Sequence, residues 1–437
     1  MSDTRITIVG GGLAGSEAAW QCAKRGVSVA LYEMRPGGAT PAHRTGLLAE
    51  LVCSNSLKSN SISTASGLLK EEMRRLDSLI LRAADANAVP AGDALAVDRH
   101  RFAAAVTEEL ERMSGVTVFR EEVSKLPSDG ITVVAAGPLT SDALSAEIAA
   151  VTGEEHLYFY DAIAPTIDAE SIDRSKVFKA SRYGKGEEAY LNCPLDRREY
   201  DALWEALVSA EKAPCREWEE IKFFEGCLPV EELAARGRRT LAFGPMRPVG
   251  LTDPKTGKRP YANVQLRQEN LEATLYGMVG FQTRLKWPEQ KRVFRMIPGL
   301  ENAEFVRYGA VHRNTFINSP KLLLRTLQLK DRPFVLFAGQ LTGVEGYVES
   351  AAMGLLAGIN AARLARGEEA VEAPRETMIG ALASFLIEPE PRSFQPMNAN
   401  FAILPAIFPR IHDKIERHRR LTERALAGLD EWRRCVG

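Results

Sequence analysis

The sequence of 437 residues lacks several features that mark whole classes of protein. Every apolar run falls short of the roughly 18 residues that a membrane-spanning helix needs, and no apolar signal segment follows the N-terminus. The six cysteines form no C-x-x-C pair, so no zinc site is expected. The 56 Lys and Arg nearly balance the 57 Asp and Glu, so bulk charge does not attract nucleic acid. We therefore expect a cytoplasmic protein with free thiols, no membrane segment and no bound metal.

The N-terminus carries a dinucleotide-binding pattern. Residues 5–9 are a β-branched run, the turn G-G-G-L-A-G follows at residues 10–15, and residues 16–26 have helical spacing. In such a unit one glycine permits the tight turn, one lets the backbone approach a pyrophosphate, and one allows the helix to pack on the strand. A second strand-like run ends in an acid that can accept hydrogen bonds from a ribose. The predicted cofactor-binding residues are Gly10, Gly11, Gly12, Leu13, Ala14, Gly15 and Glu33.

A distant segment predicts the other part of the same site. Residues 334–339 are typical of a buried strand, and a glycine-containing loop then leads into a long helix. In flavoproteins built from two separated segments, such a strand returns to the first Rossmann unit and covers the flavin, which favours FAD over NAD. An ordinary βα unit that completes the sheet is the alternative interpretation. The candidate cofactor-binding residues here are Gly339, Gln340, Gly343, Glu345, Gly346 and Tyr347.

These patterns define a domain organisation. A third strand candidate at residues 131–138 closes the first segment, and the chain from there to about residue 304 has the character of an insertion. We predict an α/β fold in which a two-segment Rossmann-type FAD-binding domain, residues 1–140 and 305–437, is interrupted by a mixed α+β insertion domain, residues 141–304. Near the C-terminus, helical spacing predicts an amphipathic helix docked on the body. Its apolar residues are Ile415, Leu426, Leu429 and Trp432.

Positive charge is concentrated in one part of the predicted insertion. Between residues 236 and 295 there are 13 Lys and Arg against 4 Asp and Glu. This block either binds a polyanion or spreads its charges over several solvated faces. Two aromatic residues there, Phe281 and Trp287, either stack on bases or, as the simpler interpretation, pack in the core. The candidate RNA-binding residues are Lys286, Arg292 and Arg295.

Several stretches match one family more closely than they match flavoproteins in general. They include LVCSNSLKSN at residues 51–60, FEGCLPVEELAARG at 224–237, HRNTFINSP at 312–320 and AGQLTGVEGYVESAA at 338–352. On these blocks the chain resembles the folate-dependent, FAD-containing tRNA (uracil-5-)-methyltransferases over nearly its whole length. The resemblance implies methylation of a T-loop uridine in the T arm of tRNA. It also implies FAD as carrier of a methylene from 5,10-methylenetetrahydrofolate, with NADPH or NADH as reductant.

The resemblance also implies roles for two cysteines. Uracil C5 is a poor nucleophile, and a thiolate that adds to C6 turns the ring into an enolate able to attack a one-carbon electrophile. Cys53 and Cys227 lie in matched blocks. The resemblance favours Cys227 as the nucleophile and Cys53 either as the assisting acid or base or as the group that handles the methylene intermediate. An exchange of these catalytic roles stays open. Cys22, inside the first predicted helix, is expected to be structural.

Other functions stay open on the sequence. The same chemistry can act on a uridine of large-subunit ribosomal RNA, because the motifs describe the reaction better than they describe the RNA. A flavoprotein oxidoreductase of small molecules would need neither folate nor RNA, and its basic block would only be solvated. A tRNA-binding module without catalysis is disfavoured because binding requires neither Cys53 nor Cys227. None of these patterns predicts the oligomeric state.

Overall fold

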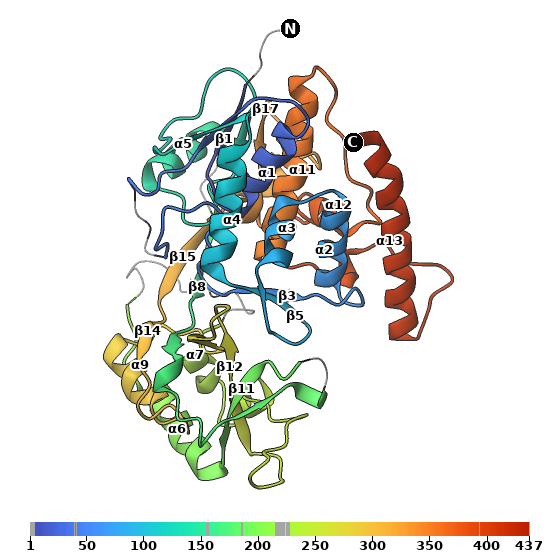
Figure 1. Ribbon diagram of the computed structural model, residues 1–437. Coiled ribbons are helices and arrows are strands. Elements are labelled where there is room, and N and C mark those ends of the chain that lie inside the picture. The colour runs from blue at the N-terminus through green and yellow to red at the C-terminus, as the bar shows by residue number, and fades with distance from the viewer. Residues whose placement is uncertain are drawn as a thin grey trace.

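The computed structural model describes residues 5–38, 40, 42–153, 157–184, 187–214, 223, 228–392 and 394–436. Figure 1 shows a larger part that holds both ends of the chain and a smaller part that is built from its middle. Each part has its own six-stranded sheet and its own buried apolar cluster. The described helices include none that is both long and apolar enough to cross a membrane.

The larger part is organised around a sheet in which five of the six strands run parallel. The strands in spatial order are β16 Gln328–Leu329, β17 Arg332–Phe337, β7 Thr132–Val134, β1 Ile6–Val9, β2 Val29–Tyr32 and β6 Val116–Phe119. The edge strand β16 pairs antiparallel with β17. Because β7 pairs with both β1 and β17, strands from the two ends of the sequence share one sheet. The α/β fold class predicted from the sequence is therefore confirmed for this part.

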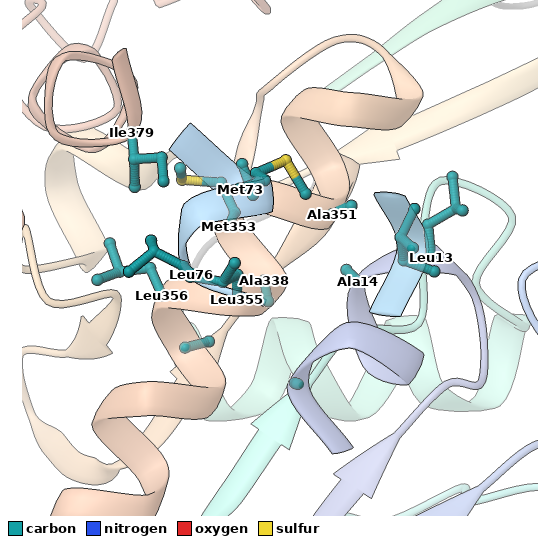
Figure 2. Packing of buried hydrophobic residues seen from close by; sticks show 14 of the residues in the cluster. Leu13, Ala14, Met73, Leu76, Ala338, Ala351, Met353, Leu355, Leu356 and Ile379 are labelled. Carbon is teal, nitrogen blue, oxygen red and sulfur yellow. The ribbon is translucent and has the colours of Figure 1, made fainter. Parts of the chain in front are cut away.

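Two helices from distant segments pack against each other beside this sheet. α1 spans Leu13–Ala23 and α11 spans Tyr347–Ala365. Their backbones approach closely, because a Cβ built on Gly354 would lie 2.2 Å from the carbonyl oxygen of Ala14. Figure 2 shows buried side chains of both helices in one apolar cluster. The segment that follows β17 therefore returns to the first βα unit, as the sequence predicts.

Further helices cover the larger part. They are α2 Ala65–Arg75, α3 Leu79–Ala86, α4 Arg99–Arg112, α5 Asp142–Thr152, α10 Ser319–Leu322, α12 Met378–Phe385 and α13 Lys414–Val436. α13 is the amphipathic helix predicted near the C-terminus, and it buries Leu429 and Trp432. The prediction was wrong for Ile415, which is 80% exposed, because burial along α13 begins only at Leu421.

The smaller part is built on an antiparallel sheet. Its strands in spatial order are β10 Phe178–Ala180, β11 Tyr190–Leu195, β12 Ala262–Gln268, β13 Leu275–Met278, β9 Thr166–Asp168 and β14 Phe305–Arg307. Its helices include α6 Arg197–Ser209, α7 Val230–Ala235, α8 Thr240–Phe243 and α9 Trp287–Phe294. Phe281 is fully buried here, so the core interpretation of that residue is confirmed. β14 joins this sheet, although the sequence placed residue 305 with the second nucleotide-binding segment, because Phe305 packs on Phe294.

Two short sheets lie where the parts meet in Figure 1. β8 Leu157–Ala162 and β15 Val311–Phe316 form an antiparallel pair that links the parts. β3 Ser56–Ser59, β5 Ala94–Val97 and β4 Ala88–Val89 form a three-stranded antiparallel sheet. The segment between β2 and β3 carries Cys53 into this region.

Candidate active site

The predicted glycine turn joins β1 to α1. Gly10 has a φ of +103°, a conformation that favours glycine. Gly15 cannot carry a side chain without displacing the turn, because its Cβ would lie 1.8 Å from the carbonyl oxygen of Gly10. Gly12 differs, since a Cβ there would meet no atom within 4 Å. Packing of the protein therefore requires glycine at positions 10 and 15, whereas Gly12 faces a cavity.

This cavity, called the glycine-turn cavity below, lies at the carboxyl ends of β1, β2 and β7 and reaches α11. Its lining includes the predicted residues Gly10, Gly12, Leu13, Ala14, Glu33, Gly339, Gln340 and Tyr347. In the described part of the chain, no side chain caps the N-terminus of α1. The first backbone N–H groups of a helix attract an anion, so the cavity has an anion-binding end.

The other predicted cofactor residues lie behind or beside this cavity. They are Gly11, Gly15, Gly343, Glu345 and Gly346. Gly11 donates its N–H to Glu33, with a nitrogen–oxygen distance of 3.0 Å. Gly343 packs on the Phe394 ring, which would lie 2.4 Å from an added Cβ. Glu345 and Gly346 line an adjoining cavity.

Glu33 lies at the end of β2, as predicted, but its carboxylate already has protein donors. One oxygen accepts from the backbone N–H and the Nε of Arg35, and the other accepts from Gly11 and the Nη2 of Arg35. These bonds with Arg35 outweigh burial and lower the pKa of Glu33. A carboxylate has about four acceptor sites. A ribose hydroxyl would therefore have to replace one of these donors.

The adjoining cavity, called the Cys53 cavity below, contains a thiol among polar groups. Its lining includes Cys53, Lys58, Asp161, Asn314, Glu345 and Tyr347. It shares Gln340 and Tyr347 with the glycine-turn cavity, so the two cavities meet at the N-terminus of α11. The structure thus brings together Cys53 and residues of both predicted cofactor segments.

Tyr347 holds the backbone and the thiol of Cys53 at once. Its hydroxyl oxygen accepts the N–H of Cys53 at 2.7 Å and the N–H of Ser54 at 3.2 Å. The sulfur of Cys53 lies 2.9 Å from the same oxygen. Because a tyrosine hydroxyl has one proton to donate, and its oxygen already accepts two N–H groups, that proton is directed at the sulfur.

Cys53 has the electrostatic environment of a protonated thiol. Burial and the nearby carboxylate of Asp161 raise the pKa of Cys53 to about 11, although the Tyr347 hydrogen bond and Arg99 act in the opposite direction. Burial and Asp161 also raise the pKa of Glu345 well above its usual value. At neutral pH the thiol is therefore an acid rather than a thiolate nucleophile.

Polar groups line the wall of the Cys53 cavity. Lys58 forms an ion pair with Glu349 at 2.9 Å and donates to Asn398 at 2.8 Å. Asn314 on β15 is only 1% exposed. Among the described residues, neither its amide nitrogen nor its amide oxygen has a hydrogen-bond partner. An unpaired buried amide is costly, so Asn314 offers both its NH₂ donor group and its acceptor oxygen to a ligand.

The loop that carries Cys53 is attached to the smaller part. On β12, Arg267 donates from Nε to the Asn55 side-chain oxygen and from Nη2 to the Ser54 hydroxyl, both at 2.7 Å. Asn55 in turn donates to the carbonyl of Gln268 at 2.9 Å. Arg307 on β14 donates to the carbonyl of Val52. Residues of the smaller part therefore fix the position of the thiol.

The other predicted site residues are not brought together with Cys53. Cys227 lies outside the described residues. Lys286 is paired with Glu211 at 2.7 Å, and Arg292 is paired with Glu289 at 2.6 Å. Arg295 donates to the carbonyl of Ala303 at 2.8 and 3.1 Å. None of these three basic residues lines the cavities described above. The buried thiol of Cys22 donates to the carbonyl of Gly358, as expected of a structural cysteine.

Sequence reasoning missed several polar residues around the thiol. Lys58 and Asn314 lie inside the family blocks LVCSNSLKSN and HRNTFINSP. Their position in these blocks could therefore have marked them as candidate site residues. Arg307 lies in a further matched block at residues 278–309, whereas Asp161 and Arg99 belong to no matched block. Distant pairings bring them near Cys53: β3 pairs with β5 beside Arg99, β8 with β15 at Asp161, and β14 with β9 at Arg307.

Comparison with known proteins gives consistent matches over the chain. The family model for glucose inhibited division protein A matches residues 5–369. The solved structure of Aquifex aeolicus GidA in its form II crystal superposes with a TM-score of 0.69 at 19% identity, and the match covers 98% of this chain and 76% of that chain. The form I crystal structure gives a TM-score of 0.67 at 18% identity, covering 98% and 78%. These two likenesses show the fold.

Curated relatives are much closer in sequence. The protein named methylenetetrahydrofolate--tRNA-(uracil-5-)-methyltransferase TrmFO from Brevibacillus brevis is 62% identical over 426 residues, covering 98% of this chain and 97% of its own. The protein of that name from Pelotomaculum thermopropionicum is 60% identical over 436 residues and 100% of each chain. The chain therefore belongs to the TrmFO family of methylenetetrahydrofolate--tRNA-(uracil-5-)-methyltransferases.

Proposed function

We propose that this chain methylates C5 of the T-loop uridine in the T arm of tRNA, with 5,10-methylenetetrahydrofolate as one-carbon donor and FAD as cofactor. Relatives of about 60% identity over the full chain are named for tRNA uracil methylation. The structural observation that carries the proposal is the meeting of the glycine-turn cavity and the Cys53 cavity at Tyr347. A cofactor site and a thiol thereby share one wall.

FAD fits the glycine-turn cavity on two observations. Gly12 faces open space, so the need for glycine there comes from a ligand that approaches the backbone. The N-terminus of α1 supplies N–H groups for a pyrophosphate. The proposed FAD contacts are Gly10, Gly11, Gly12, Leu13, Ala14, Gly15, Glu33, Gly339, Gln340 and Tyr347. Gly343, Glu345 and Gly346 would shape the entry to α11.

When bound, FAD carries the one-carbon unit and the reducing equivalents that NADPH or NADH supplies. The chain's own residues hold and orient the reacting groups. Tyr347 fixes the backbone of Cys53 and directs a proton at its sulfur. The buried amide of Asn314 suits the C=O and N–H edge of a ring such as uracil, flavin or pterin. Burial of these groups excludes water from the reaction.

We propose different catalytic roles for Cys53 and Cys227. We assign Cys227 as the nucleophile that adds to C6 of uracil, on its sequence match alone. Cys53 is assigned as the acid or base, because its thiol is protonated at neutral pH and lies under the Tyr347 hydroxyl. A thiol with a pKa of about 11 holds its proton at neutral pH, so Cys53 would act as a base only after it has donated that proton.

We propose that one part of the fold binds FAD and the other part binds RNA. Residues 1–140 and 305–437 would form the FAD-binding domain, without β14 and with the addition of α5, which packs on the parallel sheet. The remainder of residues 141–304 would form the domain that faces RNA. This division is supported by the meeting point of the two sheets, where β12 and β14 fix the loop of Cys53. Lys286, Arg292 and Arg295 remain proposed RNA contacts, although each would have to exchange an internal partner for a phosphate.

The proposal is tested by transfer of label to RNA. The purified protein is incubated with FAD, NADPH, labelled 5,10-methylenetetrahydrofolate and unmodified tRNA, and the nucleosides are analysed by mass spectrometry. Label is expected in 5-methyluridine at the T-loop position. Cys227→Ala is the matched control, expected to keep bound flavin and lose the label. Label on ribosomal RNA but not on tRNA would overturn the assigned substrate, and no label on either would overturn the assigned reaction.

A further inference from the structure

A second groove opens between the two parts, beyond the Cys53 loop. Its lining includes Arg44, Arg99, Arg101, Trp287, Arg307 and Tyr308, together with the acids Asp98, Glu269 and Glu272. We call it the arginine groove. It shares Arg99, Thr166 and Glu269 with a smaller cavity that Cys53 itself lines. The exposed groove and the cavity that Cys53 lines are therefore neighbours, with these three residues between them.

Trp287 forms an exposed aromatic shelf in this groove. It is 61% exposed, which contradicts the simpler sequence interpretation of this residue as core. Its ring stacks on Tyr308, with centroids 5.4 Å apart and planes 14° from parallel. Tyr308 stacks in turn on Phe305 at 5.5 Å and 24°. The inner rings fix the orientation of Trp287, and the high exposure of Trp287 leaves ring surface on which a planar ligand can stack.

Two of the four groove arginines, Arg44 and Arg307, carry positive charge that no described acid pairs with, whereas Arg101 pairs with Glu272. Burial, together with Arg99 and Arg44, lowers the pKa of Arg307 to about 10, so the three guanidinium groups lie close enough to repel one another. Arg99 pairs with Glu269 at 2.6 Å. Within the described part of the chain, no acidic side chain forms an ion pair with Arg44 or Arg307. The Nε of Arg99 is buried without a hydrogen-bond partner there. This cluster has the charge to bind an anion.

We propose that the arginine groove binds a nucleotide of the RNA next to the target uridine, with its base stacked on Trp287 and its phosphate at Arg44 and Arg307. The inference rests on the proposed RNA methylation. An aromatic face combined with arginines is the pairing that proteins use for unstacked nucleotides. A uridine withdrawn from a folded loop displaces its neighbours, and the groove offers such a neighbour a place outside the thiol cavity.

The experiment measures RNA binding and catalysis separately in Trp287→Ala. The control is Phe243→Ala, because Phe243 is an exposed aromatic residue of the same part, at 68%, that lies outside the groove. Kd for unmodified tRNA, KM for methylenetetrahydrofolate and the rate of flavin reduction by NADPH are determined for each protein. We expect Trp287→Ala to raise the Kd for tRNA roughly 10- to 100-fold and leave the folate and NADPH parameters unchanged. Phe243→Ala should bind tRNA as the unaltered protein does.

Two further variants make the test specific. Trp287→Phe keeps a stacking face, so it should recover affinity to within about fivefold of the unaltered protein. Arg44→Ala should weaken binding uniformly across RNA sequences and reduce the slope of log Kd against log salt by about 1. An unchanged Kd in Trp287→Ala, or a rise in the folate KM alone, would overturn the inference. If the unaltered protein binds tRNA through Trp287 but methylates nothing, the groove stands and the proposed function fails.

Discussion

At the residue scale, the hydroxyl of Tyr347 and the burial of Cys53 have opposite effects on the pKa of the Cys53 thiol. The hydroxyl lowers the pKa of Cys53 through its hydrogen bond, but burial outweighs it and the pKa stays at about 11. Only the thiolate reacts with iodoacetamide. We therefore predict that alkylation of Cys53 accelerates about tenfold per pH unit up to about pH 10 without a plateau. Peptide mass spectrometry follows this rate, with the exposed Cys435 as the reference thiol.

The variant Tyr347→Phe tests the effect of the hydroxyl on the alkylation rate of Cys53. Without the hydroxyl, the thiolate loses the hydrogen bond that favours it, so alkylation of Cys53 should be roughly tenfold slower at each pH. The phenyl ring keeps the packing, so the flavin content should not change. Equal rates in the two proteins, or a plateau below pH 9, would contradict the geometry described for this pair.

A second residue-scale prediction concerns the unpaired amide of Asn314. Leucine has a similar shape and carries no unpaired polar group, so Asn314→Leu should raise the free energy of unfolding of the ligand-free protein by about 1 kcal/mol. It should also lower methyl transfer, because the amide that contacts a ligand is lost. Denaturant unfolding and the labelling assay measure the two effects. Asn192→Leu is the control, expected to destabilise, because the buried amide of Asn192 is fully bonded.

At the element scale, the turn between β1 and α1 separates a packing requirement from a ligand requirement. Gly12→Ala should keep the Tm of the FAD-free protein within about 2 °C and yield colourless protein, because its Cβ enters only the cavity. Gly15→Ala should lower that Tm by several degrees, because its Cβ collides with the carbonyl of Gly10. Absorbance at flavin wavelengths and calorimetry distinguish the outcomes. If the Gly12→Ala protein is yellow and has full flavin content, the proposed contact between Gly12 and the FAD pyrophosphate is wrong.

The elements predicted correctly are those whose cause is local. The β-branched run of β1, the glycine turn and the helical spacing of α1 are fixed by neighbouring residues, so the sequence alone located them. The helix itself begins at Leu13, three residues before the predicted start at residue 16. Trp287 was misjudged because an aromatic residue in a helix is usually buried, whereas here it is the first residue of α9. Glu33 was expected to accept from a ribose, but Arg35, two residues away, occupies its acceptor sites.

At the scale of the whole molecule, the site depends on contacts that no local pattern encodes. Arg44, Arg99 and Arg307 come from three segments far apart in the sequence, and Arg307 reaches the other two because β14 joins the second sheet. The charge excess counted between residues 236 and 295 contains none of them. Net charge along a sequence therefore located the basic block but missed the arginine cluster nearest to the thiol.

The attachment of the Cys53 loop to β12 leads to the last prediction. Arg267→Ala removes the two bonds that Arg267 donates to Ser54 and Asn55 and leaves only the bond from Asn55 to the carbonyl of Gln268, so a substrate held by the smaller part should be poorly aligned with the thiol. We expect kcat for methylation to fall roughly 10- to 100-fold, since a displacement of about 1 Å has that effect. Flavin content and Kd for tRNA should hardly change. Lys176→Ala, which breaks a surface ion pair with Glu301 within the same part, should leave kcat unaltered. If Arg267→Ala instead weakens tRNA binding at constant kcat, Arg267 is an RNA contact, and the two parts are aligned by other bonds.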